Sequence, residues 1–419
     1  MPPIMTTPVP DDLAATIRDT KQQLKGQVGD VAAVMVEVEA AMREEVAEIV
    51  AAREAGEEVF PVIAFEDIAA GTVPEEKIAA VRQRGCAVVR GTFGRAEAEG
   101  WDRDIANYLE TNRFAETYRG PADQVFAGLA SSKPQIYPIY WSKPQVQARQ
   151  DERMVAVRSF LNAFWKTESQ GEVWFDPNRD TGYPDRIRRR EPGSSSRGLS
   201  PHTDSGSIER WLLPGYQQAF GKIFAGEWRD YDPWDAAYRT SVHEFESEAG
   251  CSVFRTFQGW TALSEMQPED GVLHVVPIPH AMSHLLLRAL QDDVAADDLC
   301  GAANGQSLPI NERHHATLLP ALTPIPAIEP GDTVWWHSDV IHSVAEVSAQ
   351  ERWGNVMYIP VSPWCEKNAA YAEDCGRAFL RGASPSDFVA EDYEVDWVGR
   401  ATIDDLTPTG RKQYGLEPW

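Results

Sequence analysis

Three side chains in this sequence have the types and the spacing of a metal-binding site. His202 and Asp204 stand two residues apart, and His342 follows much later in the chain. Two imidazoles and one carboxylate in this order can hold a non-haem Fe(II) ion and leave coordination positions open for other ligands. Because residues i and i+2 of a strand point to the same face, a strand here would direct His202 and Asp204 toward one ion.

The His-x-Asp motif is not specific by itself, because the chain has 9 histidines and repeats the motif at His337 and Asp339. Only His342 follows this second copy, and it stands too close to Asp339 for a triad that is assembled from distant strands. We therefore expect His202, Asp204 and His342 to bind the metal and to form the catalytic centre. We expect His337 to be a structural histidine or one that supports the ligands.

One arginine indicates what the open coordination positions would bind. Arg352 follows ten residues after His342, in a run with the composition of a strand. A guanidinium group can bind a carboxylate through two parallel charge-assisted hydrogen bonds. We therefore expect Arg352 to anchor the co-substrate 2-oxoglutarate, which would take two positions on the iron and leave a third for O2. The alternative is that Arg352 forms a salt bridge at the surface.

Together these residues predict a non-haem iron dioxygenase that depends on Fe(II), 2-oxoglutarate and O2. Such an enzyme hydroxylates or otherwise oxidises a small molecule and releases succinate and CO2. Two other classes stay open. One is a metal-dependent hydrolase or isomerase on a cupin-like barrel, since three protein ligands and a water also suit zinc. The other is a non-catalytic metal-binding protein. Arg352 favours the oxygenase, because a hydrolase does not use a carboxylate anchor at that position.

A stripe of basic residues precedes the first two ligands and concerns the substrate. Arg186, Arg188 and Arg190 alternate along one short segment, and Arg197 follows nearby. Three guanidinium groups on one strand face of an acidic protein favour an anionic ligand. The alternative is a solvated edge whose arginines pair with the many carboxylates of the chain. We expect a small polar or anionic substrate to bind near these arginines, between the metal and residues 205–249.

Composition excludes some partners and indicates a compartment. The 419 residues carry 64 acidic against 39 basic side chains, a formal net charge of −25, which disfavours nucleic acid as a partner. The five cysteines are widely spaced and form no Cys-x-x-Cys pair, as in reduced cytosolic proteins. No stretch has the pattern of a signal peptide or the length of a membrane span. We expect a cytoplasmic protein without a membrane partner.

The elements that must position these residues are many short strands with helices around them. Strand-like runs lie mostly in residues 184–191 and 250–362, including 251–257, 273–276, 317–319, 333–336 and 356–361, with turn signals at Asp270-Gly271 and Pro330-Gly331. This pattern predicts a mainly β fold with helical additions. We expect residues 1–10 to be disordered, 11–57 to form a helical segment, and 58–419 to form one domain with a helical insertion at 205–249.

Two helical segments carry apolar residues that admit two interpretations. In the first, a stripe from Val31 to Ile49 recurs at three- and four-residue steps. It could pack on its own domain or, being nearly heptad-like, join two copies as a homo-oligomer. In the second, the insertion at 205–249 is rich in aromatic residues. These could form a helical core or a lid beside the metal.

Three segments of the chain resemble a known family. Residues 258–263, 270–277 and 331–343 carry, in order, a Trp-Thr-Ala-Leu strand, an Asp-Gly turn and a Gly-Asp strand that leads to His-Ser. They resemble the phytanoyl-CoA-dioxygenase-like branch of the Fe(II)/2-oxoglutarate oxygenases. Over residues 30–419 the chain looks closer still to the YbiU-like family of that branch. The resemblance implies a double-stranded β-helix (jelly-roll) core, iron at His202, Asp204 and His342, and Arg352 at the co-substrate. It implies no particular substrate.

Overall fold

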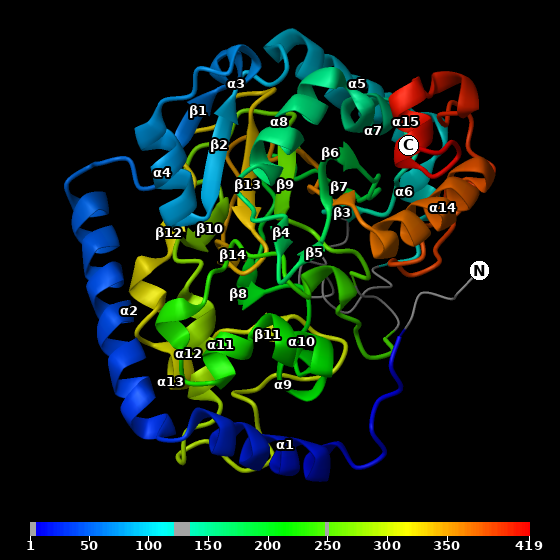
Figure 1. Ribbon diagram of the computed structural model, residues 1–419. Coiled ribbons are helices and arrows are strands. Elements are labelled where there is room, and N and C mark those ends of the chain that lie inside the picture. The colour runs from blue at the N-terminus through cyan, green and yellow to red at the C-terminus, as the bar shows by residue number, and fades with distance from the viewer. Residues whose placement is uncertain (1–5, 121–134, 248–250) are drawn as a thin grey trace.

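The computed structural model describes residues 6–120, 135–247 and 251–419, and its centre is formed by two β-sheets (Figure 1). The larger sheet has seven strands in the order β1 (Val62–Ala64), β2 (Cys86–Arg90), β13 (Thr333–His337), β9 (Phe257–Ala262), β15 (Val356–Tyr358), β7 (Ile187–Arg188) and β3 (Ile136–Tyr137). The smaller sheet has five strands in the order β11 (Leu308–Pro309), β8 (Leu199–Thr203), β14 (Ile341–Val344), β10 (Leu273–Val276) and β12 (Thr323–Pro324). Two short pairs complete the strands: β4 (Glu168–Ser169) with β5 (Glu172–Val173), and β6 (Asp176–Asp180) with β16 (Pro363–Trp364).

The two sheets pack face to face through an apolar core. In the larger sheet Val334 lies opposite Trp260, Trp260 lies opposite Tyr358, and Val356 lies opposite Arg188. Directly paired residues share a face, and alternate residues of a strand return to it, so these side chains all belong to the inner face. The core between the sheets joins this face to the smaller sheet, through residues that include Val88, Trp260, Val334 and Val356 on one side and Leu273 and Val275 on the other.

The outer face of the larger sheet is covered by helices, which explains why its central strands are buried throughout. Every residue of β9 and β13 is buried. Trp335 points outward and packs in one core with Val157 and Leu161 of α8 (Glu152–Asn162). At Gly259 the sheet approaches this tryptophan so closely that an added Cβ would lie 2.2 Å from the Trp335 ring. A strand buried on both faces loses the alternation of a half-exposed strand.

Helices enclose the remaining sides of the two sheets. Around the larger sheet lie α3 (Phe65–Ala70), α4 (Glu75–Arg84), α5 (Arg95–Thr111), α6 (Phe114–Thr117), α7 (Lys143–Gln150) and α8. The C-terminal part contributes α14 (Glu366–Arg381), η5 (Ile403–Asp405) and α15 (Pro408–Gln413). Near the smaller sheet lie α12 (Ala281–Arg288), α13 (Glu312–His315) and η4 (Leu319–Ala321). The outcome is a mixed α/β architecture, in which helices contribute more than the additions to a mainly β fold that we expected.

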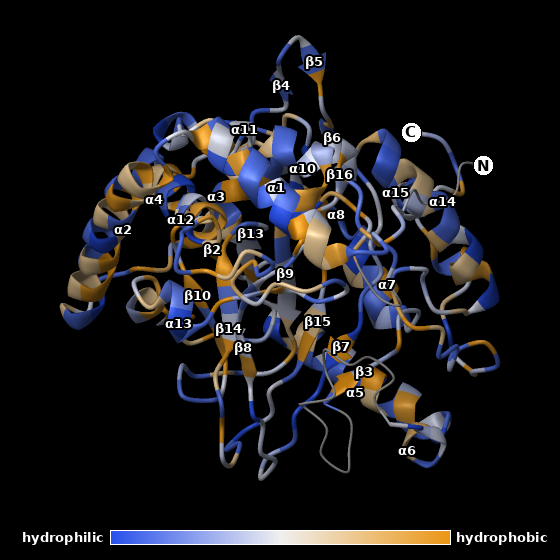
Figure 2. Cartoon of the chain, turned by 90° about the horizontal axis from the view of Figure 1, so that it is seen from below, coloured by the Kyte–Doolittle hydropathy of each residue, from blue (hydrophilic) through white to orange (hydrophobic). Residues whose placement is uncertain are grey.

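Two N-terminal helices form an arm along the outside of the molecule (Figure 1). Asp12 caps α1 (Leu13–Val28) by accepting a hydrogen bond from the backbone N–H of Ala15, and Asp30 caps α2 (Val31–Glu54) in the same way. The predicted stripe of α2 is buried in a core shared with α12 of the same chain. In Figure 2 the side of α1 toward the viewer is largely hydrophilic, whereas the chain around β2, to its left in this view, is hydrophobic. The stripe therefore packs on its own chain, and a homo-oligomer stays a prediction.

The insertion at 205–249 folds as short helices whose aromatic side chains are largely core. They are α9 (Glu209–Leu212), α10 (Pro214–Ala219), α11 (Gly221–Phe224), η2 (Trp228–Asp230) and η3 (Arg239–Ser241). Trp211, Tyr216, Phe220, Phe224 and Tyr231 are buried together with residues of α1, α2 and α12. The polar ends of the same segment reach the cavity described below, so the insertion combines both interpretations.

Three local expectations differ from the structure. Residues 251–256 precede β9 as irregular chain, and residues 317–319 lead into the turn of η4 rather than a strand, because Pro320 lacks the N–H that a ladder needs. Residues 1–5 of the segment expected to be disordered lie outside the described residues. Thr7 is ordered instead, since its backbone N–H donates to Glu244 and its carbonyl accepts from Glu246. Within the described ranges, no helix combines the length and the apolar character that crossing a bilayer requires.

Candidate metal centre

The two predicted histidine ligands lie side by side on neighbouring strands. His202 on β8 and His342 on β14 are directly opposite each other in an antiparallel pair, and their ring centroids are 4.2 Å apart. Asp204 follows the end of β8, with its Oδ1 3.6 Å from Nε2 of His202 and its Oδ2 3.5 Å from Nε2 of His342. One donor atom from each of the three residues lies within 4.8 Å of the others. Among the described residues this is the one group that could hold a metal ion.

Backbone carbonyls fix the protonation pattern of both imidazoles. Nδ1 of His202 lies 2.7 Å from the carbonyl oxygen of Ser200, and Nδ1 of His342 lies 3.2 Å from that of Val340. A ring nitrogen that faces a carbonyl oxygen must donate, so Nδ1 carries the hydrogen in both rings. Each Nε2 then presents its lone pair to Asp204. This tautomer is the one in which a histidine binds a metal through Nε2 while its other nitrogen is held by the protein.

The electrostatics keep both kinds of ligand in their metal-binding forms. Burial, with a smaller contribution from His342, lowers the pKa of His202 to about 4. Burial alone would raise the pKa of Asp204, but the neighbouring His342, His202 and Arg255 hold it well below its usual range. At neutral pH the site therefore contains a neutral imidazole at His202 and an ionised carboxylate.

Three further residues hold Asp204 in place. Ser205 adopts a left-handed conformation with φ of 67°, which turns the chain away from β8 directly after the ligand. Arg210 of α9 donates to the backbone carbonyl of Asp204 at 2.7 Å. Ser307 Oγ donates to Asp204 Oδ1 at 2.8 Å, which orients the carboxylate. No pattern in the sequence pointed to Ser307, because its contact joins two segments about a hundred residues apart.

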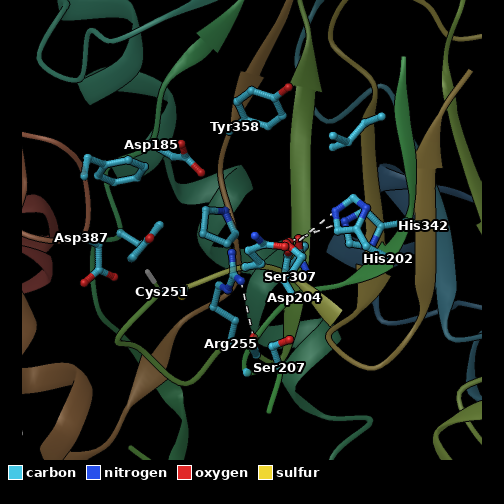
Figure 3. Close-up of a pocket in the computed structure, with 18 of the residues that line it drawn as sticks. Asp185, His202, Asp204, Ser207, Cys251, Arg255, Ser307, His342, Tyr358 and Asp387 are labelled. Carbon is cyan, nitrogen blue, oxygen red and sulfur yellow. Dashed lines mark hydrogen bonds and ion pairs between the residues drawn. The ribbon is translucent and has the colours of Figure 1, made fainter. Parts of the chain in front are cut away.

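The triad forms part of the wall of a cavity of about 260 Å³ (Figure 3). One side of the cavity is the inner face of the sheets, with Trp260, Trp336, Tyr358, Leu273 and Val344. The other side is formed by the insertion and the C-terminal region, with Ser205, Ser207, Glu244, Phe245, Asp387 and Phe388. The space is slightly smaller than a typical drug-sized site, and it has the mixed apolar and polar lining of a site for small molecules.

Arg352 does not reach this cavity, and the expectation that it anchors a co-substrate there is not met. Its Nη1 lies 2.7 Å from Oδ2 of Asp270, and 36% of its side chain is exposed. Strand β15 begins only at Val356, so Arg352 stands in the preceding loop and not at an inward position of the strand. The arrangement is the surface salt bridge that we gave as the alternative.

The four arginines of the basic stripe separate into three groups. Arg186 and Arg188 line the cavity. Arg190 is buried on the same side, but its Nη2 donates to the carbonyl of Gly271 at 2.6 Å and closes the Asp270-Gly271 turn. Burial lowers the pKa of Arg190 to about 9. Arg197 is exposed and does not line the cavity. The alternation along the segment therefore brings two of the four to the ligand space.

Arg188 is a buried guanidinium on the inner face of the larger sheet. Only 6% of the residue is exposed. Its Nε donates to the carbonyl of Gly354 at 3.2 Å, and its Nη2 contacts the sulfur of Met266 at 3.5 Å. No carboxylate of the described chain forms an ion pair with it, and burial lowers its pKa. A buried cation with free donors and no counter-ion is expected to bind an anion from outside the chain.

His337 lies away from the triad, on the opposite face of β13. Its ring stacks on Trp165 at a centroid distance of 4.6 Å and an interplanar angle of 7°. Nε2 lies 3.0 Å from the carbonyl of Pro233, and Nδ1 accepts a hydrogen bond from the backbone N–H of Asp339. Asp339 itself pairs with Arg239 at 2.7 Å. The second His-x-Asp copy is thus part of the helix–sheet packing.

The fold and these ligands define a mixed α/β protein with a candidate metal centre between two sheets. The chain matches the Gig2-like family over residues 11–416 and belongs to that family. It is 53% identical to the uncharacterised YbiU protein of Escherichia coli strain K12 over 411 residues, which are 98% of each chain. The predicted resemblance to the YbiU-like proteins is confirmed.

Solved structures share the whole architecture. A hypothetical protein from Escherichia coli is 51% identical with a TM-score of 0.92, covering 99% of this chain and 100% of that chain. A protein from Salmonella typhimurium LT2, named as a candidate oxidoreductase, is 52% identical with a TM-score of 0.95 and the same coverage. The GlcNAc Inducible Gene 2 protein from Candida albicans is 26% identical with a TM-score of 0.79, covering 99% of this chain and 91% of that chain.

Proposed function

We propose that the protein is an Fe(II)- and 2-oxoglutarate-dependent oxygenase that oxidises a small molecule and releases succinate and CO2. The observation that carries this proposal is the convergence of His202, Asp204 and His342 on one wall of a cavity that also contains Arg188, a buried guanidinium without an ion-pair partner among the described residues. Two imidazoles and one carboxylate are the facial triad of non-haem iron oxygenases. When bound, Fe(II) supplies the redox chemistry by which O2 oxidises co-substrate and substrate.

The donor set fits such an ion. Both Nε2 atoms and both carboxylate oxygens carry lone pairs, and they face the same small space at 3.5–3.6 Å. With hydrogens on the Nδ1 atoms, no proton lies between these lone pairs, so their mutual repulsion is relieved by a cation. Three ligands on one side leave the cavity side open for exogenous ligands.

Arg188 is the residue that we propose for the distal carboxylate of 2-oxoglutarate, in place of Arg352. It lies on the inner face of β7, across the sandwich from the two histidines on β8 and β14. Apolar neighbours in the cavity, among them Trp260 and Leu273, keep the surroundings dry. A carboxylate held there by a guanidinium fork gains more than it would in water. The 2-oxo acid end of the co-substrate would then point toward the triad.

The proposal extends to the fold and the compartment. Two facing sheets, with the ligands on adjacent antiparallel strands of the smaller one, fit a double-stranded β-helix of the phytanoyl-CoA-dioxygenase-like branch. The five cysteines are all free thiols. Free thiols suit a cytoplasmic enzyme, and the acidic surface suits a small-molecule substrate rather than nucleic acid.

Calorimetry of 2-oxoglutarate binding under anaerobic conditions tests the proposed function. The protein is titrated without metal and after loading with one equivalent of Fe(II), and Asp204→Ala serves as the matched control. We expect tight binding only to the loaded wild type, and succinate release after O2 is admitted. Equal binding with and without metal, or no binding, would contradict the proposal. Stoichiometric zinc with hydrolytic turnover and no succinate would favour the hydrolase class.

A further inference from the structure

A second buried guanidinium lines the same cavity, at the side of Asp204 that faces the C-terminal region. Arg255 stands just before β9 and is only 8% exposed. Figure 3 shows it between Asp204 and Ser307 on one side and Asp387 and Cys251 on the other. Arg255 is not among the site residues expected from the sequence, because it lies outside the basic stripe.

Arg255 has few partners within the chain. Its guanidinium makes one long hydrogen bond, from Nη2 to Oγ of Ser205 at 3.5 Å, and its buried Nε has no hydrogen-bond partner among the described residues. Its guanidinium lies over the ring of Tyr183 at 5.8 Å. No residue that the structure describes comes within ion-pair distance of it. A buried charge in this state is costly unless a ligand completes its hydrogen bonds.

Arg255 remains charged in spite of its burial. Burial alone would lower its pKa, but Cys251, Tyr183, Asp204 and Asp185 raise it above the ordinary value. A divalent ion on the triad would take up the charge of Asp204, which is one of these neighbours. Loading the metal site would therefore leave Arg255 with a greater need for a counter-ion.

We propose that Arg255 binds the carboxylate of the primary substrate, and that this substrate is a small monocarboxylate with hydroxyl or amino groups. This inference rests on the proposed function, in which Arg188 is already occupied by 2-oxoglutarate. One planar fork matches one carboxylate. Five carboxylates also line the cavity, namely Asp185, Asp204, Glu209, Glu244 and Asp387, and their field disfavours a doubly charged phosphate.

Two carboxylic acids beside Arg255 indicate which other groups the substrate carries. Asp185 accepts a hydrogen bond from the backbone N–H of Arg186 through Oδ1. Asp387 accepts from the backbone N–H of Ser252, and burial raises its pKa to about 6. Both are acceptors in the cavity wall, which suits hydroxyl or amino donors on the substrate. The site therefore favours a substrate that has a carboxylate next to Arg255 and hydroxyl or amino donors next to Asp185 and Asp387.

A binding comparison between hydroxy acids and their uncharged counterparts tests this inference. The probes are glycolate, L-lactate, D-glycerate and D-gluconate, paired with ethylene glycol, propane-1,2-diol, glycerol and D-glucitol. Calorimetry uses the full chain loaded with Fe(II) and saturated with 2-oxoglutarate under anaerobic conditions. We expect at least one acid to bind at least about tenfold more tightly than its counterpart, which corresponds to roughly 1.4 kcal/mol.

Two variants and one matched control locate the binding. Arg255→Met should weaken the preferred acid at least about tenfold, and Arg255→Lys should restore only part of the affinity, because an ammonium lacks the fork. Arg197→Met, which removes an exposed arginine outside the cavity, should bind like the wild type. The melting temperature of Arg255→Met should equal or exceed that of the wild type, since an unpaired buried charge is removed.

The outcomes separate this inference from the proposed function. Binding of 2-oxoglutarate should be retained in Arg255→Met, so loss of the acid alone supports a separate substrate site. If no acid is preferred over its counterpart, or if Arg255→Met binds the acid unchanged, the inference is overturned while 2-oxoglutarate binding to the wild type still stands. If 2-oxoglutarate does not bind to the wild type, the proposed function fails, and the acid titration is then repeated without it to judge Arg255 independently.

Discussion

His202 and His342 are directly paired across two antiparallel strands, and each donates its Nδ1 hydrogen to the carbonyl two residues before it. The same local geometry therefore prepares both rings, and both direct Nε2 toward Asp204. Because the orientation comes from backbone carbonyls, it does not depend on neighbouring mobile side chains. This preorganisation is the basis of the predictions on metal binding.

The first prediction concerns the ligands. His202→Ala, Asp204→Ala and His342→Ala should each lose stoichiometric Fe(II), because two remaining donors do not hold the ion. His337→Ala should retain it, although it should be destabilised by roughly 2–5 kcal/mol through loss of a buried, stacked ring. Metal analysis of the purified variants, together with thermal unfolding, measures both effects. Full iron content in His342→Ala would remove that residue from the ligand set.

The second prediction concerns the co-substrate. Arg188→Ala should weaken 2-oxoglutarate binding by roughly 2–5 kcal/mol, the range for removing one partner of a buried charge pair. Arg188→Lys should recover part of this loss. Arg352→Ala is the matched control, since its guanidinium pairs with Asp270 outside the cavity, and it should bind 2-oxoglutarate like the wild type. If calorimetry instead shows weaker binding in Arg352→Ala and unchanged binding in Arg188→Ala, then Arg352 is the residue that binds the co-substrate.

The third prediction concerns Ser307. Its hydroxyl donates to Oδ1 of Asp204 at 2.8 Å and so holds the carboxylate that faces both histidines. Ser307→Ala should lower Fe(II) affinity by about 10–100-fold, as removal of a supporting hydrogen bond does at other metal sites. Competition titration with a metal-binding dye gives the affinity. Ser307→Thr keeps the hydroxyl and should stay close to the wild type, and equal affinity in Ser307→Ala would show that the bond is dispensable.

The fourth prediction concerns the pH dependence of stability. Burial lowers the pKa of His337 to about 3, whereas the unfolded chain has a value near 6.5. Between these values the unfolded state binds a proton that the folded state excludes, so acidification favours unfolding. Between about pH 6.5 and about pH 3, the exclusion of this proton should lower the free energy of unfolding by about 1.4 kcal/mol for each pH unit of acidification.

Urea unfolding of the wild type and of His337→Gln at pH 7, 6, 5 and 4 isolates this contribution. The glutamine side chain can replace both hydrogen bonds of the ring but does not titrate. The variant should therefore lose less stability than the wild type on acidification. Parallel pH profiles for the two proteins would mean that His337 is protonated in the folded state or that another group dominates.

The sequence by itself determined the features that depend on neighbouring residues. His202 and Asp204 reach the same space because they stand two apart at the end of a strand, and periodicity alone identifies that. The stripe of α2 was readable for the same reason, since one helical turn decides which residues share a face. The basic stripe likewise gave the common direction of Arg186 and Arg188.

Only the tertiary structure decided which arginine reaches the ligand space. Arg352 had the right distance in sequence from His342, but β15 starts after it, and Asp270 holds it outside. Arg188 lies in the cavity because β7 pairs with β15, and Arg255 because the chain enters β9 beside Asp204. Strand pairing and loop packing join residues that are far apart in sequence, and register across a sheet is set by many such contacts at once. No local pattern encodes them, so the anchors for the ligands became visible only in the folded chain.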